Sequence, residues 1–253
     1  MLVTNDDGVR APGIMALARA LDVCGDVVVV APDRERSAVG HAVTMTQPLR
    51  AWNEKWPDGR EVFAVDGTPA DCVKIAVKAL LEAPPDAVVS GINLGGNAGV
   101  NVIYSGTVSA ATEATILGIP AAAVSLDSFV DKNFEVAGRV AAWVATRILD
   151  EGLPPGVLLN VNVPATGGEE PAGVRVTRQS GAVMEDRYDE RLDPRGRRYF
   201  WLAAERLGVP DPKDDDDMTA LREGYVSITP IHYDLTDEEA RRRIAGWVDE
   251  AAF

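Results

Sequence analysis

Short runs of apolar residues alternate, over the first two thirds of the chain, with longer segments whose apolar residues recur at helical spacing. A short run that is apolar throughout is typical of a buried strand, whereas apolar positions at i, i+3, i+4 and i+7 indicate a helix with one buried face. The predicted strands lie at residues 1–3, 26–30, 86–89, 121–125 and 158–163, and the predicted helices at residues 12–21, 68–80, 105–117 and 134–149. Because strands alternate with helices, we predict an α/β protein with a mostly parallel sheet.

The last third of the chain has a different pattern. A Gly- and Glu-containing loop at residues 165–171 marks a boundary, and strand-like segments flank a Pro-Arg-Gly turn at residues 193–197. The sequence Thr236-Asp237-Glu238-Glu239 matches a capping box that begins a final helix. We therefore predict a core at residues 1–165, a β-hairpin extension that returns to the core at residues 173–233, and a C-terminal helix at residues 234–253.

Three aromatic residues, Tyr199 to Trp201, follow one another in the predicted hairpin. A hairpin of two strands is only marginally stable alone, and a large exposed apolar surface is typical of an interface. We expect a second subunit to cover these residues.

Polar residues gather where the predicted strands end. Asp6 and Asp7 follow the first strand, Ser37 lies in the loop after the second, and Asn93 lies in a Gly- and Asn-rich loop after the strand at residues 86–89. In an open α/β sheet the ligand crevice lies outside the carboxyl ends of the strands, so these residues are expected at its rim. Each motif alone is also explained as an ordinary turn or cap, since Asn, Asp and Ser satisfy local backbone groups.

The chemistry of this set is that of a hard cation beside an anion site. Carboxylate, hydroxyl and amide oxygens suit magnesium, manganese or calcium, whereas zinc favours His and Cys. Ser105, Gly106 and Thr107 form a predicted helix start, whose free N–H groups favour an anion. A cation next to such a helix start is suited to hydrolysis of a phosphate monoester, because both neutralise charge on the phosphate.

Charge and composition exclude several other classes of protein. A formal net charge of −14 argues against a nucleic-acid partner bound through its phosphates. No apolar run approaches a membrane span, and the first strand begins at Met1 without a preceding signal, so we expect a cytoplasmic protein. Cys24 and Cys72 are expected to be reduced core thiols, His41 and His232 to be structural, and the run Asp214 to Asp217 to be a solvated loop.

The motifs, taken together and in order, resemble the SurE family of survival-protein nucleotidases. The matching segments are Val3–Gly8, Ala31–Ser37, Ser90–Asn93 with Gly96-Asn97, Tyr104–Val108, Asp193–Gly196 with Tyr199 and Trp201, and Gly224–Pro230. They extend from residue 1 to about residue 235. Asn101 and Ala114 depart from the family pattern, in which an acidic residue and a glycine are usual.

The resemblance implies a metal-dependent phosphatase that acts on nucleoside 5′- and 3′-monophosphates, with one divalent cation, Mg²⁺ or Mn²⁺, in each subunit. It implies a Rossmann-like three-layer core and an extended hairpin exchanged between subunits of a homodimer or homotetramer. Asp6 and Asp7 would be the catalytic residues. The implied metal ligands are Asp6, Asp7, Ser37 and Asn93, and the implied phosphate contacts are Asn97, Ser105, Gly106 and Thr107. We expect the nucleophile to be a water activated by the metal or by one of the aspartates, because neither His is placed as a base.

Three alternative functions are weighed against this interpretation. A phosphatase of the haloacid-dehalogenase type also ends its first strand in aspartates and forms a covalent aspartyl-phosphate, but it uses Asp-x-Asp spacing, and Asp6 and Asp7 are adjacent. A receiver-like signalling domain would be about half as long. A metal- and nucleotide-binding protein without turnover is equally consistent with the ligand set.

Overall fold

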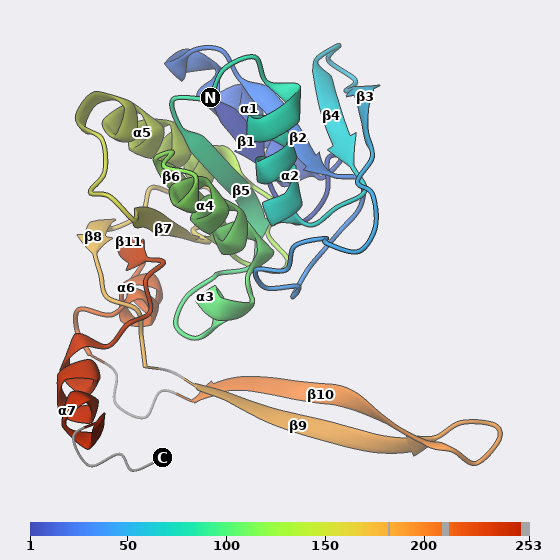
Figure 1. The fold of residues 1–253 in the computed structure, drawn as a ribbon, viewed down its shortest axis with the longest axis vertical. Coiled ribbons are helices and arrows are strands. Elements are labelled where there is room, and N and C mark those ends of the chain that lie inside the picture. The colour runs from blue at the N-terminus through green and yellow to red at the C-terminus, as the bar shows by residue number, and fades with distance from the viewer. Residues whose placement is uncertain (182, 209–212, 249–253) are drawn as a thin grey trace.

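The core of the protein is one nine-stranded sheet, whose strands spread from β3 at the right to β8 at the left of Figure 1. The structure, a computed structural model, describes residues 1–181, 183–208 and 213–248. The strand order is β3-β4-β2-β1-β5-β6-β7-β11-β8. These strands are β1 (Leu2–Thr4), β2 (Val28–Pro32), β3 (Ala51–Lys55), β4 (Glu61–Val65), β5 (Val88–Leu94), β6 (Ala121–Asp127), β7 (Val157–Pro164), β8 (Gly173–Val176) and β11 (Tyr225–His232).

The centre of the sheet is parallel. β4, β2, β1, β5, β6 and β7 all run in the same direction, whereas β3 and β11 run antiparallel to their neighbours β4 and β7. Central strands of a parallel sheet are buried on both faces, which explains why their sequences are apolar without alternation. The predicted strand at residues 86–89 is longer in the structure, because β5 continues to Leu94 and therefore includes Asn93.

Helices cover both faces of the sheet (Figure 1). The helices are α1 (Pro12–Leu21), α2 (Pro69–Ile75), which continues as a π-helical turn (Ala76–Leu80), α3 (Asn101–Tyr104), α4 (Gly106–Ile116), α5 (Glu135–Glu151), α6 (Asp217–Arg222) and α7 (Glu238–Val248), with a short 3₁₀ turn at Asp22–Cys24. Val89 packs in one apolar cluster with residues of α1 and α5, and its neighbour Val88 packs in a second cluster with residues of α2 and α4. Because successive strand residues point to opposite faces, this division defines three layers.

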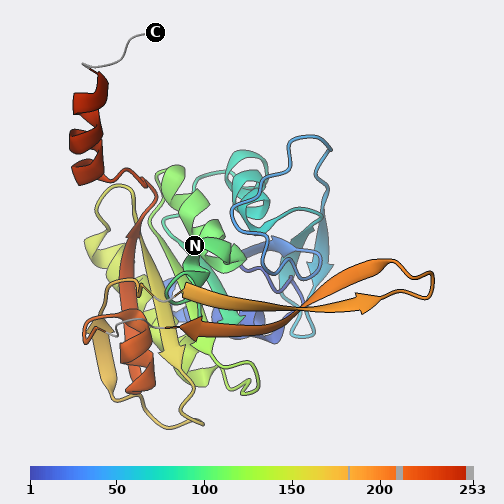
Figure 2. The same cartoon turned by 90° about the horizontal axis from the view of Figure 1, so that it is seen from below.

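The two remaining strands, β9 (Val183–Leu192) and β10 (Arg198–Gly208), form a separate antiparallel hairpin. Figure 2 shows this hairpin extending across one side of the core, with α7 projecting at the opposite end of the molecule. Tyr199, Phe200 and Trp201 are between 38% and 59% exposed, so the structure leaves them uncovered within this chain. The predicted fold class, with its parallel core, hairpin and C-terminal helix, is confirmed.

The proposed division into segments 1–165, 173–233 and 234–253 stays a prediction. β8 and β11 come from the middle segment and pair into the main sheet, so only β9 and β10 are separate from it. Positions 249–253 of the third segment lie outside the described residues.

Three local predictions were wrong. Asp216 and Asp217 are buried rather than solvated, because Asp216 caps α6 and Asp217 accepts hydrogen bonds from backbone groups. The final helix is capped by Asp237, which accepts a hydrogen bond from the N–H of Ala240, and not by Thr236. Cys24 is only partly buried, whereas Cys72 is fully buried; both are free thiols.

Candidate active site

The candidate site lies at the carboxyl edge of the sheet, next to its topological switch point. From β1 the chain continues to β2 on one side, and it later returns to form β5 on the other side of β1. Crevices at such a point are the usual ligand sites of open α/β sheets. A cavity of about 670 Å³ lies here. Its lining residues that belong to the predicted site are Asp6, Asp7, Ser37, Asn93, Asn97 and Ser105.

A tight turn directs the acidic pair toward this cavity. The side chain of Asn5 donates to the carbonyl of Gly8 at 3.0 Å and accepts from its N–H at 3.2 Å. Gly8 has a φ of +98°, and a Cβ there would lie 2.9 Å from the backbone carbonyl carbon of Arg34. Glycine is therefore required at this position, both for its backbone conformation and for its contact with the neighbouring loop.

Asp6 is buried against the start of α4. Its Oδ1 accepts a hydrogen bond of 2.5 Å from the hydroxyl of Thr107. A Cβ on Gly106 would lie 2.7 Å from the Cβ of Asp6, so glycine allows the helix start to approach the carboxylate. Burial raises the pKa of Asp6, and the hydrogen bonds from Thr107 oppose that rise.

Asp7 is half-buried, and its surroundings also raise its pKa. Burial first, and the charge of Asp6 second, raise the pKa of Asp7 to about 6, although a hydrogen bond from the backbone of Leu94 acts in the opposite direction. Two adjacent carboxylates that both resist ionisation mark a place where positive charge is stabilising. The described residues contain no cluster of three His, Cys, Asp or Glu side chains suited to a metal, so any cation here would depend on a mixed set of oxygen ligands.

The loop after β2 brings Ser37 and a third acidic residue to the same cavity. The N–H of Arg36 donates to the carbonyl of Asp6 at 2.7 Å, which ties this loop to the acidic turn. The hydroxyl of Ser37 donates to Oε1 of Glu35 at 2.7 Å, and both residues line the cavity. Glu35 was not predicted as a site residue, although it lies between Asp33 and Ser37 in a loop that follows a predicted strand.

Asn93 is oriented by its own strand end. Its Nδ2 donates to the carbonyl of Gly95 at 2.7 Å, which leaves the amide oxygen as the atom that can face a cation. Together, Asp6, Asp7, Ser37 and Asn93 offer carboxylate, hydroxyl and amide oxygens around one cavity. This donor set fits a hard divalent cation, as oxygen ligands do in general.

Asn97 is held by four hydrogen bonds within the sheet layer. Its N–H donates to Oδ1 of Asn162 at 2.7 Å, and its carbonyl accepts from Nδ2 of Asn160 and Nδ2 of Asn162 at 2.7 and 3.2 Å. Its side-chain amide bonds to the hydroxyl of Ser125 at 2.9 Å. Ser125, Asn160 and Asn162 are fully buried, and sequence reasoning missed all three, because they lie inside otherwise apolar strands.

The predicted helix start divides into two parts. Ser105 lines the cavity and caps α4, since its hydroxyl oxygen accepts from the N–H of Val108 at 3.1 Å. Gly106 and Thr107 do not line the cavity; they are buried behind it, against Asp6. The structure therefore brings six of the predicted site residues to one cavity and places these two directly behind the acidic pair.

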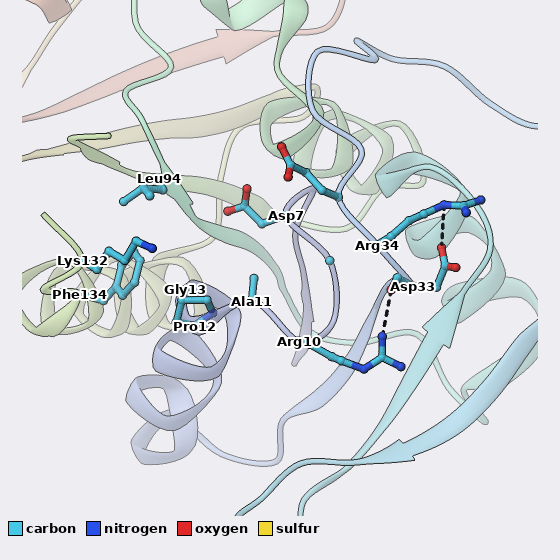
Figure 3. Close-up of a pocket in the computed structure, with 12 residues that line it drawn as sticks. Asp7, Arg10, Ala11, Pro12, Gly13, Asp33, Arg34, Leu94, Lys132 and Phe134 are labelled. Atoms are coloured by element: carbon cyan, nitrogen blue, oxygen red, sulfur yellow. Dashed lines mark hydrogen bonds and ion pairs between the residues drawn. The ribbon is translucent and has the colours of Figure 1, made fainter. Parts of the chain in front are cut away.

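A second, smaller cavity of about 400 Å³ lies on the other side of Asp7 (Figure 3). Its cationic side chains include Arg10 and Arg34. Arg10 donates to the carbonyl of Asp33 and to Glu54, and Arg34 lies 3.7 Å from the carboxylate of Asp33. Figure 3 shows these guanidinium groups directed away from Asp7, so they do not neutralise the acidic pair.

The rim of the larger cavity is apolar. Tyr104, Phe129 and Leu202 line it, and the two aromatic side chains are 53% and 82% exposed. Asn101, which departs from the family pattern, also lines the cavity, whereas Ala114 is buried inside α4. His41 lies outside the cavity lining and bonds to Oε2 of Glu113 at 2.8 Å. The site thus combines a polar floor of oxygen and N–H groups with an aromatic entrance.

Comparison with known proteins identifies the family. The model for the survival protein SurE matches residues 1–186. The chain is 51% identical over 250 residues to the 5′-nucleotidase SurE of Syntrophobacter fumaroxidans, with 98% of each chain covered. It is 52% identical over 248 residues to the 5′-nucleotidase SurE of Geobacter metallireducens, with 98% of this chain and 96% of the relative covered. The crystal structure of the SurE protein from Aquifex aeolicus superposes with a TM-score of 0.84 at 42% identity, covering 98% of this chain and 99% of the other. This protein belongs to the SurE family of survival proteins.

Proposed function

We propose that this protein is a metal-dependent phosphatase that hydrolyses nucleoside 5′-monophosphates, and also 3′-monophosphates, to nucleoside and phosphate. The observation that carries the proposal is the acidic pair Asp6–Asp7, which lies in one cavity with Asn97 and the helix cap Ser105. The 5′-nucleotidase name of relatives that match almost the whole chain supports the same reaction.

One divalent cation, Mg²⁺ or Mn²⁺, would be held in each subunit by Asp6, Asp7, Ser37 and Asn93. When bound, it supplies positive charge to the phosphate and lowers the pKa of a bound water. Glu35, which lines the same cavity and accepts from Ser37, keeps the hydroxyl of that ligand oriented.

The phosphate would be held by Asn97 and Ser105, which line the cavity, and by the helix start at Gly106 and Thr107 directly behind them. A helix start favours an anion because its first N–H groups have no partner within the helix. Tyr104 and Phe129 at the entrance are suited to the flat face of a base, since aromatic rings stack on bases of every type.

Hydrolysis forms a bond from the water oxygen to phosphorus and breaks the ester bond to the nucleoside oxygen. One carboxylate of the acidic pair would accept the proton that the attacking water loses, and Asp7 is the more exposed of the two. The leaving nucleoside oxygen takes up a proton as it departs. Asp6, fixed by Thr107, keeps its position throughout.

A second subunit would cover the hairpin, giving a homodimer or homotetramer. The exposed aromatic side chains of β10 support this assembly, because a two-stranded hairpin with an apolar surface is not stable in isolation. We also propose a cytoplasmic location without a stable nucleic-acid partner, in keeping with two free thiols and a net charge of −14. Among the described residues, no helix has the length and apolar character needed to cross a membrane.

Phosphate release from a panel of 5′- and 3′-nucleoside monophosphates, with and without a chelator, tests the proposal. We expect release that needs the cation and leaves no protein adduct when the reaction is quenched in hydroxylamine. A hydroxamate at Asp6 or Asp7 would instead indicate the covalent route of haloacid-dehalogenase phosphatases. Metal and nucleotide binding without release would favour the non-catalytic alternative.

A further inference from the structure

The loop between β5 and α3 carries Asn97. Its backbone is hydrogen-bonded to Gln179 and Asp217, which belong to the two chain segments that flank the hairpin and form its base. The N–H of Gly99 donates to Oδ2 of Asp217 at 3.0 Å, and the carbonyl of Gly99 accepts from Nε2 of Gln179 at 2.8 Å. Both backbone groups of Gly99 are therefore bound by residues 80 or more positions away in the sequence. Gly99 has a φ of +56° and lies two residues after Asn97.

Asp217 connects this loop to the chain segments before and after the hairpin. Its other oxygen, Oδ1, accepts from the N–H of Ser180 at 3.0 Å and from the N–H of Met218 at 2.9 Å. Ser180 precedes the first strand of the hairpin, β9, which begins at Val183, and Asp217 follows β10, which ends at Gly208. The N–H of Asp217 also donates to the carbonyl of Arg178 at 3.0 Å. One buried carboxylate thus joins the Asn97 loop to the chain on both sides of the hairpin.

The hairpin also reaches the cavity directly. Leu202 of β10 lines the same cavity as Asn97, and Figure 1 shows the hairpin passing below α3. A displacement of the hairpin base would therefore move the Asn97 loop and the cavity wall together.

Asp217 is buried without an ionic partner among the described residues. It is 0% exposed, and the ionic partners found for neighbouring Asp215, such as Arg178 at 2.9 Å, are absent for Asp217 among the described residues. A buried carboxylate is costly unless several donors satisfy it, and the backbone N–H groups of Gly99, Ser180 and Met218 all donate to this one. We propose that Asp217 is a positioning residue, through which the base of the hairpin fixes the loop that presents Asn97 to the phosphate; the role given to Asn97 rests on the proposed function.

Asp217→Asn tests this role with almost no change in side-chain volume. An amide has only one acceptor oxygen, so it cannot accept from Gly99 and from Ser180 through separate oxygens as the carboxylate does. Gln179→Met removes the donor to the carbonyl of Gly99 from a side chain of similar length, and it provides a second variant if Asp217→Asn does not fold. Asp215→Asn is the matched control, since it removes the same charge from an exposed side chain two residues away.

Five quantities are measured for each protein: KM and kcat for a nucleoside monophosphate, the affinity for Mn²⁺ alone, amide hydrogen exchange of residues 95–101, and the melting temperature. We expect Asp217→Asn to raise KM about tenfold, by the loss of hydrogen bonds to the loop, and to accelerate exchange in that segment. Gln179→Met should show a smaller change in the same direction. The affinity for Mn²⁺ should stay within about twofold of the wild type, because the proposed metal ligands lie outside this loop, and Asp215→Asn should resemble the wild type.

Two results would overturn the proposal. One is that Asp217→Asn matches Asp215→Asn in KM and in exchange. The other is that KM, kcat, Mn²⁺ affinity and melting temperature all deteriorate together in Asp217→Asn while Gln179→Met behaves as the wild type, which would indicate a general structural role. If the wild type releases no phosphate, the proposed function fails, and exchange at residues 95–101 still decides whether Asp217 and Gln179 position the loop.

Discussion

The hydroxyl of Thr107 donates a hydrogen bond of 2.5 Å to Oδ1 of Asp6, although 101 positions separate the two residues in the sequence. This contact joins the end of β1 to the start of α4, which are the two elements that carry the acidic pair and the helix cap Ser105. Hydrogen bonds to a carboxylate favour its charged form, so Thr107 opposes the effect of burial on Asp6. The proposed metal ligand Asp6 and the proposed phosphate site at the start of α4 are thereby held as one unit.

Replacing Thr107 with Val should therefore impair catalysis more than stability. Val has nearly the same shape, and a hydrogen bond to a charged group contributes about 1.5–3 kcal/mol, so kcat/KM should fall roughly tenfold to hundredfold. The same change should weaken Mn²⁺ binding, because Asp6 ionises less readily without its donor.

Thr115→Val is a matched control for this change. Thr115 lies on the same helix, is also buried, and donates to the carbonyl of Ala111 at 2.9 Å, far from the acidic pair. Equal effects of the two substitutions on kcat/KM and on Mn²⁺ affinity would show that the bond to Asp6 has no special role.

Asp7 should destabilise the metal-free fold at neutral pH. Its pKa of about 6 in the folded state exceeds the ordinary value of 3.8, so the folded state binds more protons between these two pH values. The contribution of Asp7 to the free energy of unfolding should consequently be most favourable below pH 4 and should decrease as the pH rises through 6. With allowance for partial exposure, the expected loss is about 1–2 kcal/mol.

Asp7→Asn removes this pH dependence, and urea unfolding in the presence of a chelator at pH 4 and pH 7 measures it. The variant should gain stability relative to the wild type only at pH 7, while phosphate release disappears. A difference between the two proteins that is the same at both pH values would contradict the raised pKa of Asp7.

Asn162 should stabilise both the fold and the Asn97 loop. Asn162→Leu leaves the N–H of Asn97 without its acceptor in a buried position, which costs about 1–3 kcal/mol of unfolding free energy. KM for the nucleotide should rise, because both the N–H and the carbonyl of Asn97 lose a hydrogen bond to Asn162. Chemical denaturation and steady-state kinetics check both effects, and an unchanged KM in a destabilised variant would separate Asn162 from the site.

The hairpin surface should control assembly. Phe200→Asp with Trp201→Asp places charge on two exposed side chains, and we expect this double variant to sediment as a monomer. Val23→Asp, at a residue that is 82% exposed on the core, is the control and should keep the assembly of the wild type. An oligomer that survives both changes in β10 would locate the interface elsewhere.

The sequence was informative where the residues that determine a feature lie next to one another in the chain. A buried strand followed by Asp6 and Asp7 predicts an acidic pair at the sheet edge, and Thr68 with Pro69 predicts the helix start that the structure confirms. Asp217 was misread for the opposite reason. A run of four acidic residues is usually solvated, and the groups that bury Asp217 belong to Gly99 and Ser180, which no local pattern connects to it.

Buried polar residues in strands were missed for a related reason. Asn160 and Asn162 interrupt an apolar strand, and their partner is a loop more than 60 residues away. Thr107 was correctly chosen as part of a helix start, but capping chemistry alone could not show that its hydroxyl is directed to Asp6. Local propensity thus predicted the elements, whereas the pairing of distant strand ends determined the contacts in the site.

The central claim is that Asp6, Asp7, Ser37 and Asn93 hold a divalent cation that phosphate release requires. Its most direct test is release of phosphate from a nucleoside 5′-monophosphate by chelator-treated protein as Mn²⁺ is added, with wild type and Asp7→Asn compared at equal concentration. We predict no release without Mn²⁺, saturable recovery in the wild type, and no recovery in Asp7→Asn. Release by the chelator-treated wild type, or equal recovery in Asp7→Asn, would contradict the account.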